Sequence, residues 1–397
     1  MKILHLTNHY APFGGIETYV IDLLPLLEKR GVENILIYRK QHPRTPAHVA
    51  GKIHYVPETG SPDYDRKAIL DLVKREKPSL IYLHDVYDAE LVEQVGDLGP
   101  AIGYVHIFYP VCPGLGKLFR RGDEICTRSY GIGCMPMIYL KQCASARHPK
   151  NIFRIMKVTA NCLTAYKSLD KVIVASQFMK ELLIQNRFQK EQIDIVPYFV
   201  PLPEREKIEK SIPDIEHPQI LFAGRLEYEK GLHYLLNALR NIENPPTLLI
   251  AGDGSMKTQY IDLANKLGLT NRVQFIGWLS DHDLQSYYSK CILTVMPSIM
   301  PEPFGKVGVE AMANGRPVVA FNVGGIPDWL MNKYNGFLVP ARDVELLSER
   351  IARLIKNIDL ATQMGMNGRQ YVEGKYSSDK HLALLLRIFD QVANLNQ

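Results

Sequence analysis

Residues 220–239, ILFAGRLEYEKGLHYLLNAL, join a short apolar run, a polar loop bounded by glycines and an amphipathic stretch. The run Ile220–Ala223 is short, apolar and followed by glycine, which predicts a β-strand. The stretch Leu232–Leu239 predicts a helix. A strand that leads through a loop into a helix is the building unit of parallel sheets with helices on their faces. We therefore expect an α/β fold.

The same alternation continues on both sides of this unit. Toward the C-terminus the pattern predicts strands and helices at Thr247–Ala251, Thr258–Leu267, Val273–Ile276, Leu293–Met296 and Val318–Phe321. In the N-terminal half it predicts them at Lys2–Thr7, Ile16–Arg30, Leu80–His84, Ile102–His106 and Lys171–Ala175, the last followed by a helix capped by Ser176. Both halves are therefore expected to be Rossmann-like, doubly wound α/β domains.

A proline-rich stretch separates the halves. Pro197, Pro201 and Pro203 cluster there, and a charge-rich segment follows to Lys210. Because 397 residues exceed one compact core, we expect an N-terminal domain at 1–200 and a C-terminal domain at 201–376. Open sheets bind ligands at the carboxyl ends of their strands, so a cleft between the domains is the expected site.

Composition places the chain among globular proteins, with 46% hydrophobic and 22% charged residues and a net charge of +5. The longest uncharged run, Leu98–Gly116, contains prolines and glycines and predicts strand and loop rather than a membrane helix. No secretory signal is visible at Met1–Thr7, so we expect a cytoplasmic protein.

Two short motifs suit a phosphate. Gly14-Gly15, between the first strand and first helix, permits close backbone approach near a helix N-terminus, although a plain tight turn explains the pair equally well. It is not the G-x-G-x-x-G fingerprint of dehydrogenases. Arg225 and Lys230 share a strand-to-helix loop where both could bind one pyrophosphate; taken alone, two solvated surface cations are the simpler interpretation.

Two glutamates stand in the apolar segment 298–313, SIMPEPFGKVGVEAMA. Prolines keep Glu302 in a loop, and the helix is expected to begin near Gly305, with Glu310 one turn inside. Free amides near Phe304 and Gly305 would suit a phosphate, and sugar or ribose hydroxyls would satisfy the carboxylates. The alternative is a capping role for Glu302 and an ion pair of Glu310 with Lys306.

These motifs together resemble the family 4 glycosyltransferases of the GT-B fold. The resemblance rests on Glu302–Gly305 through Glu310, Gly224-Arg225, Lys230-Gly231, Gly252–Gly254, Gly14-Gly15, Gly315–Ala320, Gly324–Asp328 and Asn335–Val339. It covers nearly the whole chain and implies retaining transfer of a sugar from a UDP- or GDP-linked donor to an acceptor hydroxyl, without a catalytic metal. Surface polysaccharide, lipopolysaccharide or glycolipid synthesis is the implied setting. A C-terminal helix within 377–397 is expected to cross back to the first domain.

The resemblance also implies residue roles. Arg225 and Lys230 would bind the diphosphate and stabilise the leaving group, which agrees with the charge that develops there. Glu310 would hold the ribose hydroxyls, and Glu302 would lie beside the transferred sugar. The amides of Phe304 and Gly305 would contact sugar or phosphate, and Gly14 and Gly15 would line the phosphate from the first domain.

The family also implies a histidine near the donor sugar. His84 and His106 both end predicted strands, and His106 is the better match because it starts a long loop.

Two Asp-x-Asp matches could indicate a metal-dependent transferase instead. Asp63 and Asp65 are expected in a polar loop, and Asp281 and Asp283 follow Ser280, which predicts an N-terminal helix cap. We favour the capping interpretation and expect no metal in the active site.

Cys112, Cys126, Cys134 and Cys143 fall close together in the sequence. A structural zinc ion is one interpretation, but no C-x-x-C spacing supports it, and a cytosolic setting disfavours disulfides. Segment 112–171 also carries eleven lysines and arginines against three acids, an excess of eight positive charges. It could lie on the inner face of an anionic membrane or hold a lipid-diphosphate acceptor; a solvated face is the alternative.

Other functions fit less of the sequence. A GT-B-like epimerase or phosphorylase would lack this glutamate pair, and a phosphorylase needs a cofactor lysine that has no counterpart here. A basic, cysteine-rich nucleic-acid-binding protein would leave the motifs of the second half unexplained, so no nucleic-acid partner is expected. Residue identities do not name the sugar, the base or the acceptor.

Overall fold

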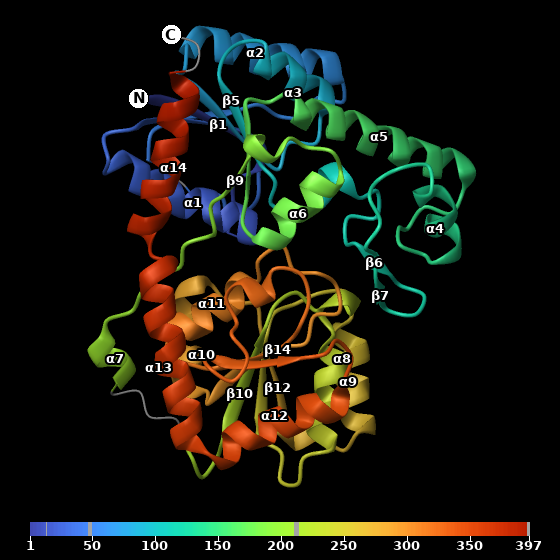
Figure 1. The fold of residues 1–397 in the computed structure, drawn as a ribbon, viewed down its shortest axis with the longest axis vertical. Helices are drawn as coiled ribbons and strands as arrows, with labels where there is room; N and C mark the ends of the chain where they lie inside the picture. The colour runs from blue at the N-terminus through green and yellow to red at the C-terminus, as the bar shows by residue number, and fades with distance from the viewer. Residues whose placement is uncertain (13, 47–49, 210–213, 395–397) are drawn as a thin grey trace. The chain divides into compact units, whose positions relative to one another are not determined.

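The computed structural model describes residues 1–12, 14–46, 50–209 and 214–394 (Figure 1). Its contacts divide the chain into two compact units. The first comprises Met1–Gly122, Cys126–Tyr198 and the chain from Ser378 onward; the second comprises Asp123–Ile125 and Phe199–Ser377. The division after Tyr198 falls inside the proline-rich stretch that predicts a linker.

A seven-stranded parallel sheet forms the centre of the first unit, in the order β3-β2-β1-β4-β5-β8-β9. Its strands are β1 (Lys2–His9), β2 (Glu33–Lys40), β3 (Lys52–Tyr55), β4 (Leu80–His84), β5 (Ala101–Tyr104), β8 (Lys171–Val174) and β9 (Ile193–Ile195). The inner strands are buried almost throughout, as expected for strands covered on both faces. Strand order reverses between β1 and β4.

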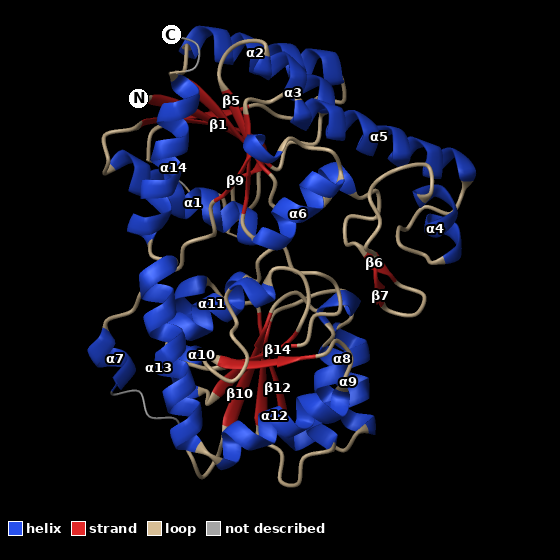
Figure 2. Cartoon of the chain, in the orientation of Figure 1, coloured by secondary structure: helices blue, strands red, loops and turns tan. Residues whose placement is uncertain are grey.

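Helices lie on both sides of this sheet (Figure 2). They are α1 (Gly15–Glu28), α2 (Pro62–Glu76), α3 (Ala89–Gly96), α5 (Pro149–Lys167) and α6 (Gln177–Gln185), with the short η2 (Lys190–Gln192). Between β5 and α5 an insertion carries η1 (Tyr109–Val111), the two-residue strands β6 (Leu118–Phe119) and β7 (Glu124–Ile125), and α4 (Cys134–Leu140).

The C-terminal helix α14 (Ser378–Ala393) belongs to the first unit, as the sequence predicts. The hydroxyl of Tyr19 on α1 lies 3.0 Å from Nε2 of His381, and Arg30 pairs with Asp379 at 2.7 Å. Phe389 packs edge-on against Tyr82 of β4, with ring centroids 5.0 Å apart. The buried face of α14 therefore completes the core of the first unit. Residues 395–397 lie outside the described chain.

The second unit holds a six-stranded parallel sheet in the order β12-β11-β10-β13-β14-β15. Its strands are β10 (Gln219–Ala223), β11 (Thr247–Ala251), β12 (Val273–Gly277), β13 (Leu293–Met296), β14 (Val318–Phe321) and β15 (Gly336–Val339). Strand order reverses between β10 and β13. That switch point is the place where open α/β sheets bind ligands, at the carboxyl ends of the strands.

Helices flank this sheet as well (Figure 2). They are α8 (Leu232–Arg240), α9 (Lys257–Lys266), α10 (Asp281–Lys290), α11 (Lys306–Ala313), α12 (Val344–Lys356) and α13 (Ile358–Lys375), with α7 (Arg205–Glu209) after the division between the units. Single helical turns are η3 (Tyr228–Lys230), η4 (Thr270–Arg272) and η5 (Ile326–Asp328).

The structure confirms most expected elements and corrects two details. Strands β4, β11, β13 and β14 have the predicted bounds, and Ser176 caps α6 by accepting from the Met179 amide. Strand β5 ends at Tyr104, so His106 lies beyond it. The pair Asp63 and Asp65, expected in a loop, lies in the first turn of α2 because Pro62 starts that helix. No helix within the described residues has the length and apolar character to cross a membrane.

Candidate functional site

Three of the predicted site residues, Arg225, Lys230 and Glu302, lie at the switch point of the second unit. The loop after β10 carries Arg225 and Lys230, and the loop after β13 carries Glu302. Because β10 and β13 are neighbours in the sheet, both loops leave the same edge. The fold thus brings together residues more than 70 positions apart in the sequence.

Close backbone packing sets the register of these two loops. The amide of Ile299 donates to the carbonyl of Glu229 at 3.0 Å. Gly231 has φ +69, and a Cβ there would collide with the carbonyl of Pro297. Only glycine tolerates both the positive φ and the close approach of this carbonyl without strain. This contact fixes Lys230 directly beside the loop that holds Glu302.

Lys230 and Glu302 form the central ion pair of the site. Nζ of Lys230 lies 2.6 Å from Oε1 of Glu302, and the hydroxyl of Ser298 donates to the same oxygen at 2.6 Å. Burial raises the pKa of Glu302, but the Lys230 charge, the two hydrogen bonds and the charge of Arg225 together hold it below the ordinary value. Glu302 is therefore a carboxylate at neutral pH.

Arg225 supplies an exposed cation next to this pair. Its side chain is accessible to solvent, yet its charge acts on Glu302. The neighbouring Leu226 is buried and anchors the loop: its amide donates to Asp253 at 2.8 Å, and its carbonyl accepts from Met256 at 2.9 Å. A fixed backbone with an exposed guanidinium is suited to binding an anion.

The loop after β14 packs against the main chain around Glu302 and hydrogen-bonds to it. The amide of Gly325 donates to the Glu302 carbonyl at 2.7 Å, and a Cβ on Gly324 would collide with the Glu302 backbone. The indole of Trp329, fully buried, donates to the carbonyl of Phe304 at 2.6 Å. These contacts keep the loop at the start of α11 in one conformation.

Helix α11 begins where the sequence predicts. Gly305 is its N-cap with φ +88, and Lys306 is its first residue. A left-handed N-cap suits glycine, and it turns the chain sharply from the proline-rich loop into the helix. Whether the amides of Phe304 and Gly305 contact a phosphate stays a prediction.

Glu310 joins a different group of side chains. It lies 3.2 Å from Nζ of Lys306 and accepts from the hydroxyl of Tyr288 at 3.2 Å, while Lys306 also pairs with Asp281. Burial raises the pKa of Glu310, and Lys306 offsets part of that effect. The ion pair with Lys306 that the sequence offered as an alternative is present. The ribose role of Glu310 remains a prediction.

The first unit has its own switch point, and carboxylates occupy it. Gly14 caps α1, and a Cβ there would meet the carboxylate of Glu17, whereas Gly15 has room. Asp85 follows β4. Burial, and after it the charge of the buried Glu17, raise the pKa of Asp85 to about 8. Sequence reasoning named the two glycines and missed Glu17 and Asp85, although Asp85 directly follows β4 and Glu17 lies in the first turn of α1, the helix after β1.

His106 lies in a buried chain of side chains inside the first unit. Its Nδ1 is 2.6 Å from the hydroxyl of Tyr198, and its Nε2 is 3.3 Å from Nδ1 of His84. His84 continues to His5 at 3.4 Å, and His5 to Oδ1 of Asn34 at 3.3 Å. Asn34 donates its side-chain amide to a main-chain carbonyl, so its Oδ1 accepts from His5. Each hydrogen bond in this row of side chains is then donated in the direction from Tyr198 toward Asn34.

These histidines are neutral at physiological pH. Burial lowers the pKa of His106 to about 3 and that of His5 to about 4, and lowers that of His84 well below its usual range. Both ring nitrogens of His106 are already engaged. The catalytic role of His106 stays a prediction, and the geometry offers a structural role beside it.

Both Asp-x-Asp matches are engaged by hydrogen bonds within the protein. Ser280 accepts from the amide of Asp283 at 3.1 Å and donates to its carboxylate, so the predicted cap of α10 is confirmed. Asp65 accepts from Thr59 and Arg39. Across residues 1–12, 14–46, 50–209 and 214–394, no three His, Cys, Asp or Glu side chains stand in metal-binding geometry.

Known proteins share this architecture. The solved structure of HepE from Anabaena, in complex with UDP and glucose, superposes with a TM-score of 0.74 over 99% of this chain and 100% of its own, at 19% identity. At that identity the likeness shows the fold, which is GT-B.

Two relatives extend the comparison to sequence. An uncharacterized glycosyltransferase of Methanocaldococcus jannaschii is 30% identical over 55% of this chain and 58% of its own length, so the match spans less than two thirds of that relative. The lipopolysaccharide core biosynthesis glycosyltransferase LpsE of Rhizobium meliloti is 24% identical over 97% of this chain and 99% of its own.

Two family models match consecutive halves of the chain. The model described as Glycosyltransferase Family 4 matches residues 13–203, and the one described as Glycosyl transferases group 1 matches residues 203–371. The second match contains the loops that carry Arg225, Lys230 and Glu302. The chain belongs to the family 4 glycosyltransferases.

Proposed function

We propose that this protein transfers a hexose from a UDP- or GDP-linked donor to a hydroxyl of a glycan or lipid-linked acceptor, with retention of configuration and without a catalytic metal. Its family membership supports sugar transfer. HepE was solved with UDP and glucose, and LpsE is named for lipopolysaccharide core synthesis, so a nucleotide sugar and a cell-surface glycan are the substrates we favour.

The grouping of Arg225, Lys230 and Glu302 at the switch point carries this proposal. In sugar transfer from a nucleotide diphosphate, negative charge builds on the departing phosphate. A guanidinium and an ammonium held on a rigid loop stabilise that charge without a metal ion. The ionised Glu302 positions Lys230 and offers an acceptor to sugar hydroxyls. Glu310 would bind the ribose.

A thermal-shift screen of UDP, GDP, ADP and their sugars, with and without Mg²⁺, tests the donor. The matching nucleotide should stabilise the chain by about 2.7 kcal/mol at roughly 100 times its Kd. The shift should not require Mg²⁺. NMR of the product then reads the anomeric configuration. Failure of every nucleotide to raise the melting temperature, or an inverted product, would contradict the proposal.

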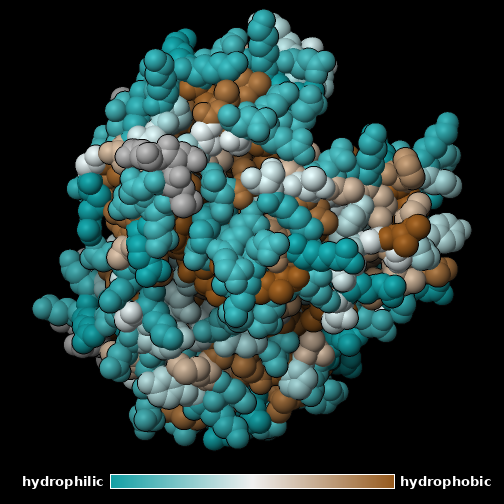
Figure 3. Space-filling view, turned by 45° about the horizontal axis from the view of Figure 1, so that its top comes forward, coloured by the Kyte–Doolittle hydropathy of each residue, from teal (hydrophilic) through white to brown (hydrophobic). Residues whose placement is uncertain are grey.

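The insertion of the first unit and the start of α5 together offer a surface for an anionic membrane. Ile132 is 85% exposed, and Tyr139 and Phe153 are each 64% exposed. Lys150 and Arg154, also exposed, lie beside Phe153 on α5. Figure 3 shows apolar patches among polar ones on the right-hand projection, where α4 and α5 lie in Figure 1. Apolar side chains surrounded by lysine and arginine are typical of interfacial membrane binding.

We expect the protein to sediment with vesicles that contain anionic phospholipid at low salt and to remain free with neutral vesicles. The triple variant Lys150→Glu, Phe153→Ala, Arg154→Glu should lose binding, because it removes both attractions. Lys356→Glu on α12, in the second unit, changes charge elsewhere and serves as the control. Equal binding by the triple variant and the wild type would rule out this surface.

A further inference from the structure

The part of the insertion between η1 and α5 has little regular structure to stabilise it. Within it, the described regular structure amounts to two strands of two residues each and one helix of seven. Its buried apolar cluster comprises Ile138, Ile152 and Met156, two of them from α5 rather than from the insertion. A segment with so small a core usually needs a covalent or metal cross-link to keep one conformation.

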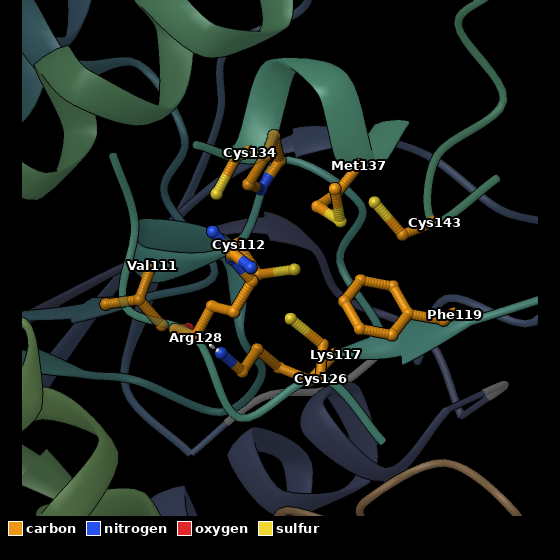
Figure 4. Close-up of a pocket in the computed structure, with 10 residues that line it drawn as sticks. Val111, Cys112, Lys117, Phe119, Cys126, Arg128, Cys134, Met137 and Cys143 are labelled. Carbon is orange, nitrogen blue, oxygen red and sulfur yellow. Dashed lines mark hydrogen bonds between the residues drawn. The ribbon is translucent and has the colours of Figure 1, made fainter. Parts of the chain in front are cut away.

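Four cysteines from separate parts of this insertion line one cavity. Cys112 follows η1, Cys126 follows β7, Cys134 begins α4, and Cys143 lies in the loop beyond it. All four line one cavity of about 20 Å³, and their side chains surround the same space in Figure 4. All four are free thiols. A space of that size accommodates a single water molecule or ion.

The four cysteine side chains share one small cavity. Four thiol groups this close are stable together when they are protonated, cross-linked or bound to a cation.

The surroundings of the cavity favour bound thiolates. Lys117 is only 3% exposed, and its ammonium donates to the carbonyl of Arg128, whose own side chain also lines the cavity. A buried ammonium needs a nearby anion, which thiolates in this cavity would supply.

We propose that Cys112, Cys126, Cys134 and Cys143 bind one structural zinc ion. A zinc ion with four thiolates carries a net double negative charge, which Lys117 and Arg128 would neutralise. The described side chains are not yet in coordination geometry, so the sulfur atoms must close in around the metal as it binds. Zinc binding would then stabilise the fold of the insertion, as in other small metal-bound segments. This proposal does not depend on the proposed function.

The first test is metal content. The purified full-length chain should contain about one zinc ion by plasma mass spectrometry. Cys126→Ser and Cys143→Ser should each reduce that content to near zero. Cys162→Ser is the matched control, because Cys162 lies outside the cavity and its sulfur donates to the carbonyl of Tyr87 at 3.1 Å, a bond that serine can keep. The control should retain the zinc.

Two further measurements keep the proposal testable if a variant fails to fold. Cobalt added to wild-type protein stripped by a chelator should give the thiolate-to-metal absorption of a tetrahedral site, and zinc should remove it. Limited proteolysis should cut within 113–148 faster after stripping. The proposal is overturned by any of three results: a chain with no metal and only two titratable thiols in denaturant, iron with sulfide in place of zinc, or zinc retained by Cys126→Ser.

Discussion

Replacing Lys230 with alanine is expected to lower kcat about 100- to 1000-fold, the effect typical of losing one preorganised group that stabilises developing charge. The ammonium of Lys230 lies in the switch-point loop, 2.6 Å from Glu302. Without it, the leaving phosphate loses a cation, and Glu302 is left buried without its main partner, which raises its pKa. Steady-state kinetics with the donor identified by thermal shift will measure the change.

Three comparison variants make this result specific. Lys257→Ala should leave kcat within about twofold. Lys257 is the first residue of α9, outside the site, and it pairs with the exposed Asp253. Lys230→Arg, which keeps the charge, should recover part of the rate. Glu310→Ala should raise KM for the donor more than it lowers kcat, as expected for a ribose contact made equally in ground and transition states.

An unchanged kcat in a folded, donor-binding Lys230→Ala variant would remove Lys230 from the catalytic set. Melting temperatures of all variants must accompany the kinetics, since a fall in kcat with a matching fall in stability would not report on chemistry. The Arg225→Ala variant, whose side chain is exposed, should behave like Lys230→Ala with little loss of stability.

The pairing of Lys230 with Glu302 was within reach of sequence reasoning. Both residues follow short apolar strands, and parallel strands deliver their following loops to one edge of the sheet. The sequence did not reveal the strand order that makes β10 and β13 neighbours, because that order depends on packing between distant segments. Ser298 was missed for the same reason: its role appears only once the loop folds back on Glu302.

For Glu310, one contact follows from local helical spacing and another depends on the fold. The family resemblance implied a ribose contact for Glu310, whereas its local context predicted an ion pair with Lys306, which needs only helical spacing. The contact with Tyr288, from a helix more than twenty residues earlier, could not be inferred from spacing. The cysteines make a similar case, since their separations lack any C-x-x-C motif and only the folded insertion brings them around one cavity.

His106 was assigned to the donor sugar from the family resemblance and from its place at the start of a long loop, and its surroundings in the structure supply a competing explanation. Replacing His106 with phenylalanine should lower the free energy of unfolding by about 2–4 kcal/mol, because the buried hydroxyl of Tyr198 and Nδ1 of His84 both lose a partner. Urea unfolding of the full chain measures this loss. Tyr198→Phe removes the contacts of this hydroxyl with His106 and Tyr104 and should cost about 1–2 kcal/mol.

The double variant His106→Phe, Tyr198→Phe separates a structural role of His106 from a catalytic one. If His106 and Tyr198 act as one hydrogen-bonded unit, their effects on stability should be less than additive, with a coupling of about 1 kcal/mol. Turnover per folded molecule should then fall little in Tyr198→Phe. A His106→Phe protein of wild-type stability that has lost turnover would instead place the imidazole at the reacting sugar. In that case the buried chain from Asn34 to Tyr198 would have to open when the donor binds, because both nitrogens of His106 are occupied within it.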